Sequence, residues 1–253
     1  MNLTQRYEAC YGPRVQQFVR DIEGVDTSGM PELHLPYWGS LYEQSKLKVG
    51  IVGRDTMTWG DMKGFVQMAK HDLAGSLHRN RYELDSLAFT GWTNNFGRTF
   101  WDTSMKILAA MHGVPDWKLL KRRQEEGPLR SFFWANTNSV ERYEVTPSKR
   151  GVPYGSWRTI KTASEVHIDS LAALLEVLRP HVVFLFNWQP EPAFMDCELD
   201  WEIFGDHQAA AFFDSTRTHI IRTAHPTWLN HSRLYRQAIE NVIERGRSIV
   251  GHI

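Results

Sequence analysis

The chain has 253 residues, enough for one large domain with a full core or for two small ones. Its 29 basic and 29 acidic side chains cancel, so no overall positive field draws it to nucleic acid, and its 42% hydrophobic residues are typical of a soluble globular protein. Two cysteines, Cys10 and Cys197, exclude a disulfide framework and favour reduced thiols in a cytoplasmic protein. No run is long and apolar enough to cross a membrane, and residues 1–10 lack the apolar core of a signal peptide.

The N-terminal half is expected to alternate helices with a strand and long polar segments. Helical spacing of apolar residues predicts helices over 14–22, 37–44, 65–73 and 100–112. Val49–Val52 is an apolar, β-branched run that predicts a buried strand, which stops at Gly53 and leads into a loop with Arg54 and Asp55. A long polar loop is expected over 75–95. Basic residues cluster at Lys118, Lys121, Arg122 and Arg123, and this cluster is taken as a solvated face.

The C-terminal half is expected to supply three more strands. These are predicted over 131–136, 181–186 and 218–223, and the first of them ends in Asn136-Thr137-Asn138. Asp169 is expected to cap a helix that ends before Pro180, and Ser232 or Asn230 is expected to cap the last helix. The acidic segment 196–206 is interpreted as a solvated surface. Strands that alternate with helices predict an α/β fold of three layers, α/β/α, around a central, mainly parallel four-stranded sheet.

We expect one domain over 1–253, with residues 1–45 as an N-terminal helical extension packed on it. The carboxyl ends of parallel strands meet at one edge of a sheet, so Asp55, Asn136 and His225 are expected in one cleft. A carboxylate there can stabilise a cation or orient water, an imidazole can donate to a leaving group, and an amide can read a donor–acceptor edge. Serine-nucleophile, phosphate-binding, dinucleotide-binding and metal-binding motifs are missing from the sequence, so neither a cofactor nor a metal is expected.

Several short segments, in order along the chain, resemble those of uracil-DNA glycosylases. Gly53-Arg54-Asp55-Thr56-Met57-Thr58 resembles their Gly-Gln-Asp-Pro-Tyr-His loop, and His225-Pro226-Thr227-Trp228-Leu229 resembles their His-Pro-Ser-Pro-Leu loop. The segment 95–101 is similar to an Asn-Arg-Phe-Trp segment of the mismatch-specific branch, and 178–183 is similar to the superfamily's helix-to-strand junction. Asn136, with Asn138 as its competitor, occupies the place of the family's base-reading asparagine.

The resemblance implies a DNA glycosylase that flips a nucleotide out of DNA and hydrolyses its N-glycosidic bond. It makes Asp55 and His225 the catalytic residues: Asp55 stabilises the sugar cation and positions water, and His225 hydrogen-bonds to the departing base. Residues implied in binding are listed here: Gly53, Arg54, Met57, Thr58, Trp92, Phe96, Asn136, Asn138 and Trp228. Trp92 or Phe96 would stack on the base, and Trp228 falls where the family wedges the duplex. The implied partner is DNA, and a monomer without membrane or metal partners is expected.

One departure from the family pattern bears on the substrate. Thr56-Met57 stands where the family has proline and the tyrosine that excludes substituents at the pyrimidine 5-position. Because methionine is flexible, we hypothesise a pocket for a 5-substituted pyrimidine, such as a bulky one of phage DNA. Whether the setting is repair or defence against foreign DNA stays open. Two cysteines cannot supply four ligands, which excludes the iron–sulfur branches of the superfamily.

Other interpretations stay open for the same residues. Asp55 can be a helix cap, His225 a loop histidine, and Asn136 and Asn138 ordinary turn residues. Trp92 and Trp228 can be packing residues. The alternative functions are a catalytically inert reader of modified bases or nucleic acid, and an N-glycosidase of free nucleosides or nucleotides.

Overall fold

A computed structural model describes residues 1–27, 30–54, 60–79, 98–140, 168–190 and 192–251. Its strands are β1 (Tyr37–Trp38), β2 (Val49–Gly53), β3 (Phe132–Asn136), β4 (Val182–Leu185), β5 (Glu202–Gly205), β6 (Gln208–Phe213) and β7 (Thr218–Thr223). Together these described strands form one mixed sheet of seven, in the order β1-β3-β2-β4-β7-β6-β5.

The predicted α/β class is confirmed, but the prediction of a four-stranded sheet is wrong. The strands expected from the sequence are β2, β3, β4 and β7, which pair in parallel at the centre. β1 adds an antiparallel strand beside β3, and β6 and β5 extend the other side, also antiparallel. The added strands gave a weak sequence signal because they are short or alanine-rich, as in Gln208–Phe213.

The central strands are buried because their sequences are almost entirely apolar. Every residue of β2, β3 and β4 is buried, the pattern of a sheet that is covered on both faces. Ile51 of β2 is paired with Trp134 of β3 on one side and Phe184 of β4 on the other. This register aligns the carboxyl ends of the three strands at one edge of the sheet.

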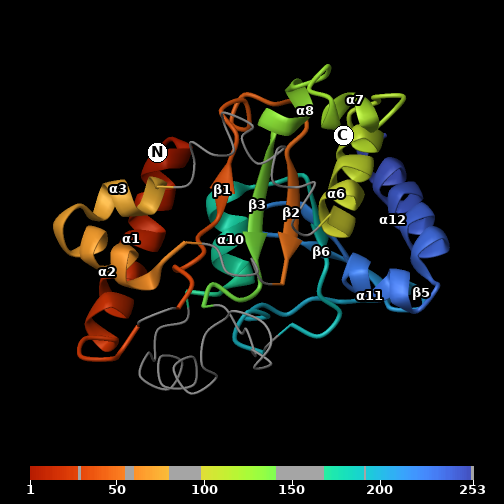
Figure 1. The fold of residues 1–253 in the computed structure, drawn as a ribbon. Helices are drawn as coiled ribbons and strands as arrows, with labels where there is room; N and C mark the ends of the chain where they lie inside the picture. The colour runs from red at the N-terminus through yellow and green to blue at the C-terminus, as the bar shows by residue number, and fades with distance from the viewer. Residues whose placement is uncertain (28–29, 55–59, 80–97, 141–167, 191, 252–253) are drawn as a thin grey trace.

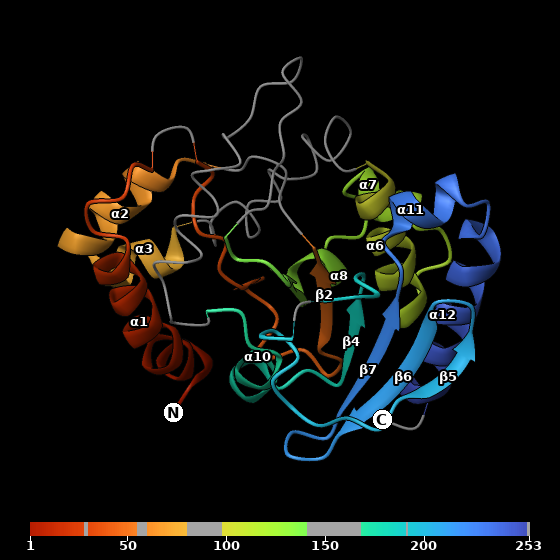
Figure 2. The ribbon, with the colours of Figure 1, turned by 90° about the horizontal axis from the view of Figure 1, so that it is seen from below.

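Helices cover both faces of the sheet (Figures 1 and 2). The described helices are α1 (Leu3–Asp21), α2 (Met62–His71), α3 (Leu73–His78), α6 (Arg98–Met111), α7 (Lys118–Lys121), α8 (Gly127–Arg130), α10 (Leu171–Leu178), α11 (Pro226–His231) and α12 (Tyr235–Val250). α6 and α12 lie on one face, and α10 lies on the other with α1 against it (Figure 2). Among the described residues, no helix combines the length and the hydropathy that crossing a membrane requires.

Two helix predictions in the N-terminal half need correction. The helix expected over 37–44 is absent: Tyr37 and Trp38 form β1, and the following residues make turns. The helix expected over 14–22 is longer, because Asn2 and Gln5 form a capping box that starts α1 at Leu3. Part of the polar loop expected from residue 75 is also helical, since α3 continues to His78.

Two predicted helix caps are wrong in the C-terminal half, and one predicted surface is confirmed. Ser170, not Asp169, caps α10, and the Asp169 carboxylate accepts from the Ser139 amide at 2.6 Å instead. Neither Asn230 nor Ser232 caps α12, which begins after Leu234 without a side-chain cap. The acidic segment 196–206 is a surface, as expected: its five carboxylate residues are exposed, and one of them, Glu202, begins the edge strand β5. The two corrections concern helix ends, where tertiary contacts outweigh local preference.

Candidate functional site

The loops that follow β2 and β3 run side by side beyond the ends of the strands. The Thr137 amide donates to the Gly53 carbonyl at 3.0 Å, and the Asn138 amide donates to the Arg54 carbonyl at 3.2 Å. Backbone hydrogen bonds therefore join the two loops just past the last pair of the sheet, Gly53 and Asn136. It holds the asparagine-rich turn against the chain that leads into residue 55.

Among the described residues, Asn136 is the predicted site residue whose side chain has an unsatisfied hydrogen-bond donor. Its side chain is only 5% exposed. Its Nδ2 has no hydrogen-bond partner in the part of the chain that the structure describes. A buried donor without an acceptor costs about 1–3 kcal/mol, so such groups point to a ligand or water. A ligand acceptor bound here would satisfy the amide.

Gly53 allows the close approach of this amide. A Cβ atom at Gly53 would lie 2.6 Å from the Asn136 Oδ1 and 3.2 and 3.3 Å from two ring carbons of Phe100. No side chain fits there without displacing one of these groups. The glycine thus serves packing at the end of β2.

The Phe100 ring lies between the Gly53–Asn136 contact and His225. Its ring stacks on the His225 imidazole, with centroids 5.9 Å apart and planes 7° apart, and it meets Phe186 edge-on at 5.6 Å. The same ring touches the position where a Cβ of Gly53 would be. Gly53, Asn136 and His225, which are far apart in the sequence, are therefore linked through one aromatic ring of α6.

His225 also has a defined orientation. Its Nδ1 accepts from the Thr227 amide at 3.3 Å, which makes it the N-cap of α11. A neutral imidazole that accepts at Nδ1 carries its hydrogen on Nε2. The half-buried ring is thus in the tautomer that can donate from Nε2.

A third polar strand end, which sequence reasoning missed, supports the asparagine turn. Asn187, just beyond β4, is buried and donates from Nδ2 to the Thr137 hydroxyl at 2.8 Å. Its Oδ1 accepts from the Gln189 amide at 3.2 Å. The available signal was a polar residue directly after an apolar strand, the same signal that selected Asn136.

Trp228 is 44% exposed on α11 and rests on a histidine that the sequence did not single out. His207 meets the Trp228 ring at 4.7 Å and the Trp188 ring at 5.5 Å, both nearly perpendicular. His207 lies between β5 and β6 with a positive φ of 55°. The β5–β6 hairpin, which was not predicted, thereby supports the exposed Trp228 ring, three residues from His225.

The remaining predicted residues divide into two groups. Arg54 is exposed at the end of β2, and Asn138 is buried beside it. Asp55, Met57, Thr58, Trp92 and Phe96 lie outside the described residues. No three His, Cys, Asp or Glu side chains gather as a metal site would need in the described part of the chain.

Comparison of the chain with protein-family models, with curated proteins and with solved structures finds no match. The class of the protein therefore depends on its own fold and site: an α/β protein with amides and an imidazole at the carboxyl edge of its sheet.

The contact between Gly53 and Asn136 gives a testable prediction. Gly53→Ala is expected to displace the Asn136 amide and the Phe100 ring rather than the backbone, because these side-chain atoms are the ones within contact distance. We expect a modest loss of stability, about 1–2 kcal/mol by urea unfolding, as for other overpacked sites. Ligand or substrate binding should weaken by more than this loss predicts.

Gly127→Ala is the matched control, because a Cβ there meets nothing within 4 Å. It should change neither stability nor binding. A Gly53→Ala protein that matches Gly127→Ala in both measurements would contradict the packing role of Gly53.

Proposed function

We propose that this chain is a DNA glycosylase that hydrolyses the N-glycosidic bond of a flipped-out pyrimidine with a 5-substituent. The observation that carries the proposal is the Phe100 ring, which touches both the Gly53 corner and the His225 imidazole. It supports a single cleft containing the two loops whose motifs resemble those of uracil-DNA glycosylases. The parallel pairing of β3, β2, β4 and β7 agrees with the mainly parallel central sheet that the resemblance implies.

In the proposed reaction, the bond between the sugar C1′ and the base nitrogen breaks, and its electron pair leaves with the base. A water oxygen then bonds to C1′ and loses a proton, while the base gains one, so an abasic site and a free base result. Asp55 stabilises the positive charge on the sugar and orients the water. The Nε2 hydrogen of His225 stabilises the negative charge that develops on the base.

The amides have a binding role in this proposal. Asn136 reads the edge of the flipped base, which would satisfy its buried Nδ2. Asn187 holds Thr137 and so fixes the turn. Trp228 contacts the duplex beside the flipped nucleotide, supported from below by His207. Removing a base from the stack costs a few kcal/mol, which such contacts must offset.

The test uses duplexes that carry one defined base: uracil, 5-hydroxymethyl or glycosylated pyrimidines, and unmodified cytosine and thymine. Alkaline cleavage of the DNA after incubation reports abasic sites, and chromatography identifies the released base. We expect release of a 5-substituted pyrimidine. Activity confined to uracil would refute the substrate class. Activity on free nucleosides alone would select a nucleosidase, and binding without release from any substrate would select an inert reader.

A further inference from the structure

A basic hollow lies between α6 and α7. It has a volume of about 340 Å³ and is lined by Arg98 and Asp102 of α6 and by Trp117, Lys118, Lys121 and Arg122 around α7. Two segments separated in sequence thus bring four cations and one carboxylate around one concavity. A basic cluster that is only a solvated face does not need a second segment to bring a further cation, Arg98, beside it.

Only part of this positive charge is neutralised within the protein. Asp102 accepts from Lys121 at 2.7 Å and lies 3.6 Å from Arg98. Lys118 and Arg122 make no ion pair with any residue that the structure describes. Arg123, the last member of the sequence cluster, pairs with Glu126 at 3.3 Å instead. An anion in the hollow would relieve the remaining repulsion.

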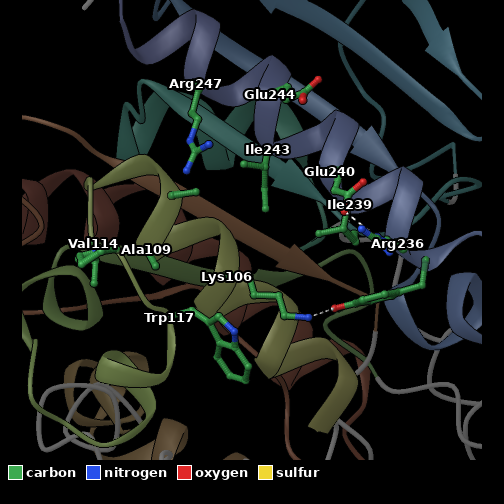
Figure 3. Close-up of a pocket in the computed structure, with 13 residues that line it drawn as sticks. Lys106, Ala109, Val114, Trp117, Arg236, Ile239, Glu240, Ile243, Glu244 and Arg247 are labelled. Carbon is green, nitrogen blue, oxygen red and sulfur yellow. Dashed lines mark hydrogen bonds and ion pairs between the residues drawn. The ribbon is translucent and has the colours of Figure 1, made fainter.

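Trp117 lines both this hollow and a groove of about 440 Å³ between α6 and α12, and Figure 3 shows the groove. Lys106 extends from α6 on the groove side, where its ammonium donates to the Tyr235 hydroxyl at 3.1 Å. The ammonium groups of Lys106 and Lys121 lie 5.4 and 5.8 Å from the Trp117 ring centroid. The groove itself mixes charges, since Arg236 pairs with Glu240, so the stronger positive field belongs to the hollow.

The hollow and the candidate site use opposite sides of the start of α6. Phe100, which contacts His225, stands between Arg98 and Asp102 in the sequence. Successive helix residues turn by about 100°, so Phe100 lies about 160° around the axis from each of them. A helix with its side chains is about 10–12 Å across, so a nucleic acid bound at both places has to pass around α6.

We propose that the basic hollow binds the phosphate backbone of a nucleic acid that flanks the flipped nucleotide, an assignment that rests on the proposed function. The ammonium and guanidinium groups match phosphodiester oxygens in charge and hydrogen bonding. Such contacts carry no sequence information but set affinity and orientation on the duplex. They also give a neutral chain a local means of binding DNA.

The test measures how affinity for a labelled, unmodified 20-base-pair duplex depends on salt. The test variant combines Lys118→Gln, Lys121→Gln and Arg122→Gln. The control combines Arg20→Gln of α1, Lys46→Gln of a loop and Lys70→Gln of α2. All three are exposed, and the change in charge is the same. Each phosphate contact contributes about 0.9 to the slope of log K against log salt. We expect the test variant to lower this slope by about 2 to 3 and the affinity about tenfold or more, and the control to match wild type.

Two further variants keep the proposal falsifiable if the triple variant folds poorly. Lys118→Gln alone removes a side chain that makes no ion pair with the described residues, and it should lower the slope by about 1. Lys118→Arg with Lys121→Arg retains the charge and should keep the wild-type slope. An unchanged slope in the Gln variants, or an equal loss of binding to poly-L-glutamate, would overturn the assignment.

The outcomes for the two proposals are separable. Base release by wild type with an unchanged slope in the Gln variants would remove the hollow from the mechanism and leave the glycosylase intact. A reduced slope in a protein that releases no base from any substrate would keep the nucleic-acid contact and refute the glycosylase.

Discussion

Replacement of His225 by alanine is expected to lower the rate of base release about 10²- to 10³-fold, with the DNA affinity largely retained. Removal of a single donor that stabilises developing charge has effects of this size in other enzymes. His225 is placed for that role by its stack on Phe100 and by the Thr227 amide, which leaves the hydrogen on Nε2. Single-turnover release of the base from a saturated duplex is the measurement. Asp55→Asn is expected to cause a loss at least as large in the same assay, about 10²-fold or more.

The controls separate chemistry from helix capping. His225→Ala also removes the cap of α11, which costs about 1 kcal/mol at typical N-caps. Asparagine is a preferred N-cap, so His225→Asn should restore stability without restoring the rate. His231→Ala changes an exposed histidine of the same helix and should leave release unchanged. Full activity of His225→Ala would refute the assigned role.

Acid is expected to destabilise the protein through His34, which is buried without a charged partner among the described residues. Its side chain is 4% exposed and lies against the rings of Trp134 and Tyr37. Burial lowers its pKa from the ordinary value of 6.5 to about 3. The unfolded chain therefore binds this proton below about pH 6.5 while the folded chain stays neutral. The free energy of unfolding is therefore unaffected by His34 above about pH 6.5. It falls by about 1.4 kcal/mol per pH unit as the pH drops from about 6.5 toward 3.

The measurement compares urea unfolding at pH 7.5 and 5.0 for wild type and His34→Phe. Phenylalanine retains a ring between Trp134 and Tyr37 but cannot take up a proton. Wild type should lose about 2 kcal/mol more than the variant between these pH values. Burial also lowers the pKa of His112, His181 and His219, but these residues are common to both proteins and cancel in the comparison. Equal losses in the two proteins would contradict the buried, neutral state of His34.

β2, β3 and β4 could be predicted because each is almost entirely apolar, and β7 has two isoleucines at its centre. The prediction for 218–223 has the same bounds as β7, and the strand predicted from Val49 is β2. β1 and β5 were missed because they are short edge strands of two and four residues, and β6 was missed because it is rich in alanine. Each carries little local signal and forms through pairing with its neighbours. The same limit explains the cap of α10. Asp169 and Ser170 are both good caps, and the choice between them depends on tertiary contacts: Asp169 with the Ser139 amide and Ser170 with Asp196.

The residues of the candidate site could be predicted from their places at the strand ends, but the contacts between them could not. Asn136, Asn138 and His225 were selected because polar residues after buried strands collect at one edge, and Gly53 was selected from the resemblance. Phe100 was expected in a helix and in a segment that resembles the family, but without a role in the site, yet its ring contacts two of the loops. Asn187 and His207 were missed, because their importance depends on what they touch.

The sequence by itself determined which residue types stand at the ends of the parallel strands and which segments are buried. It did so because apolar runs and turn residues act locally, through burial and backbone preference. Only the tertiary structure decided the edge strands, the stack of Phe100 on His225 and the meeting of Arg98 with the α7 cations. These features require segments distant in sequence to pack at particular angles, and local chain preferences carry no information about such contacts.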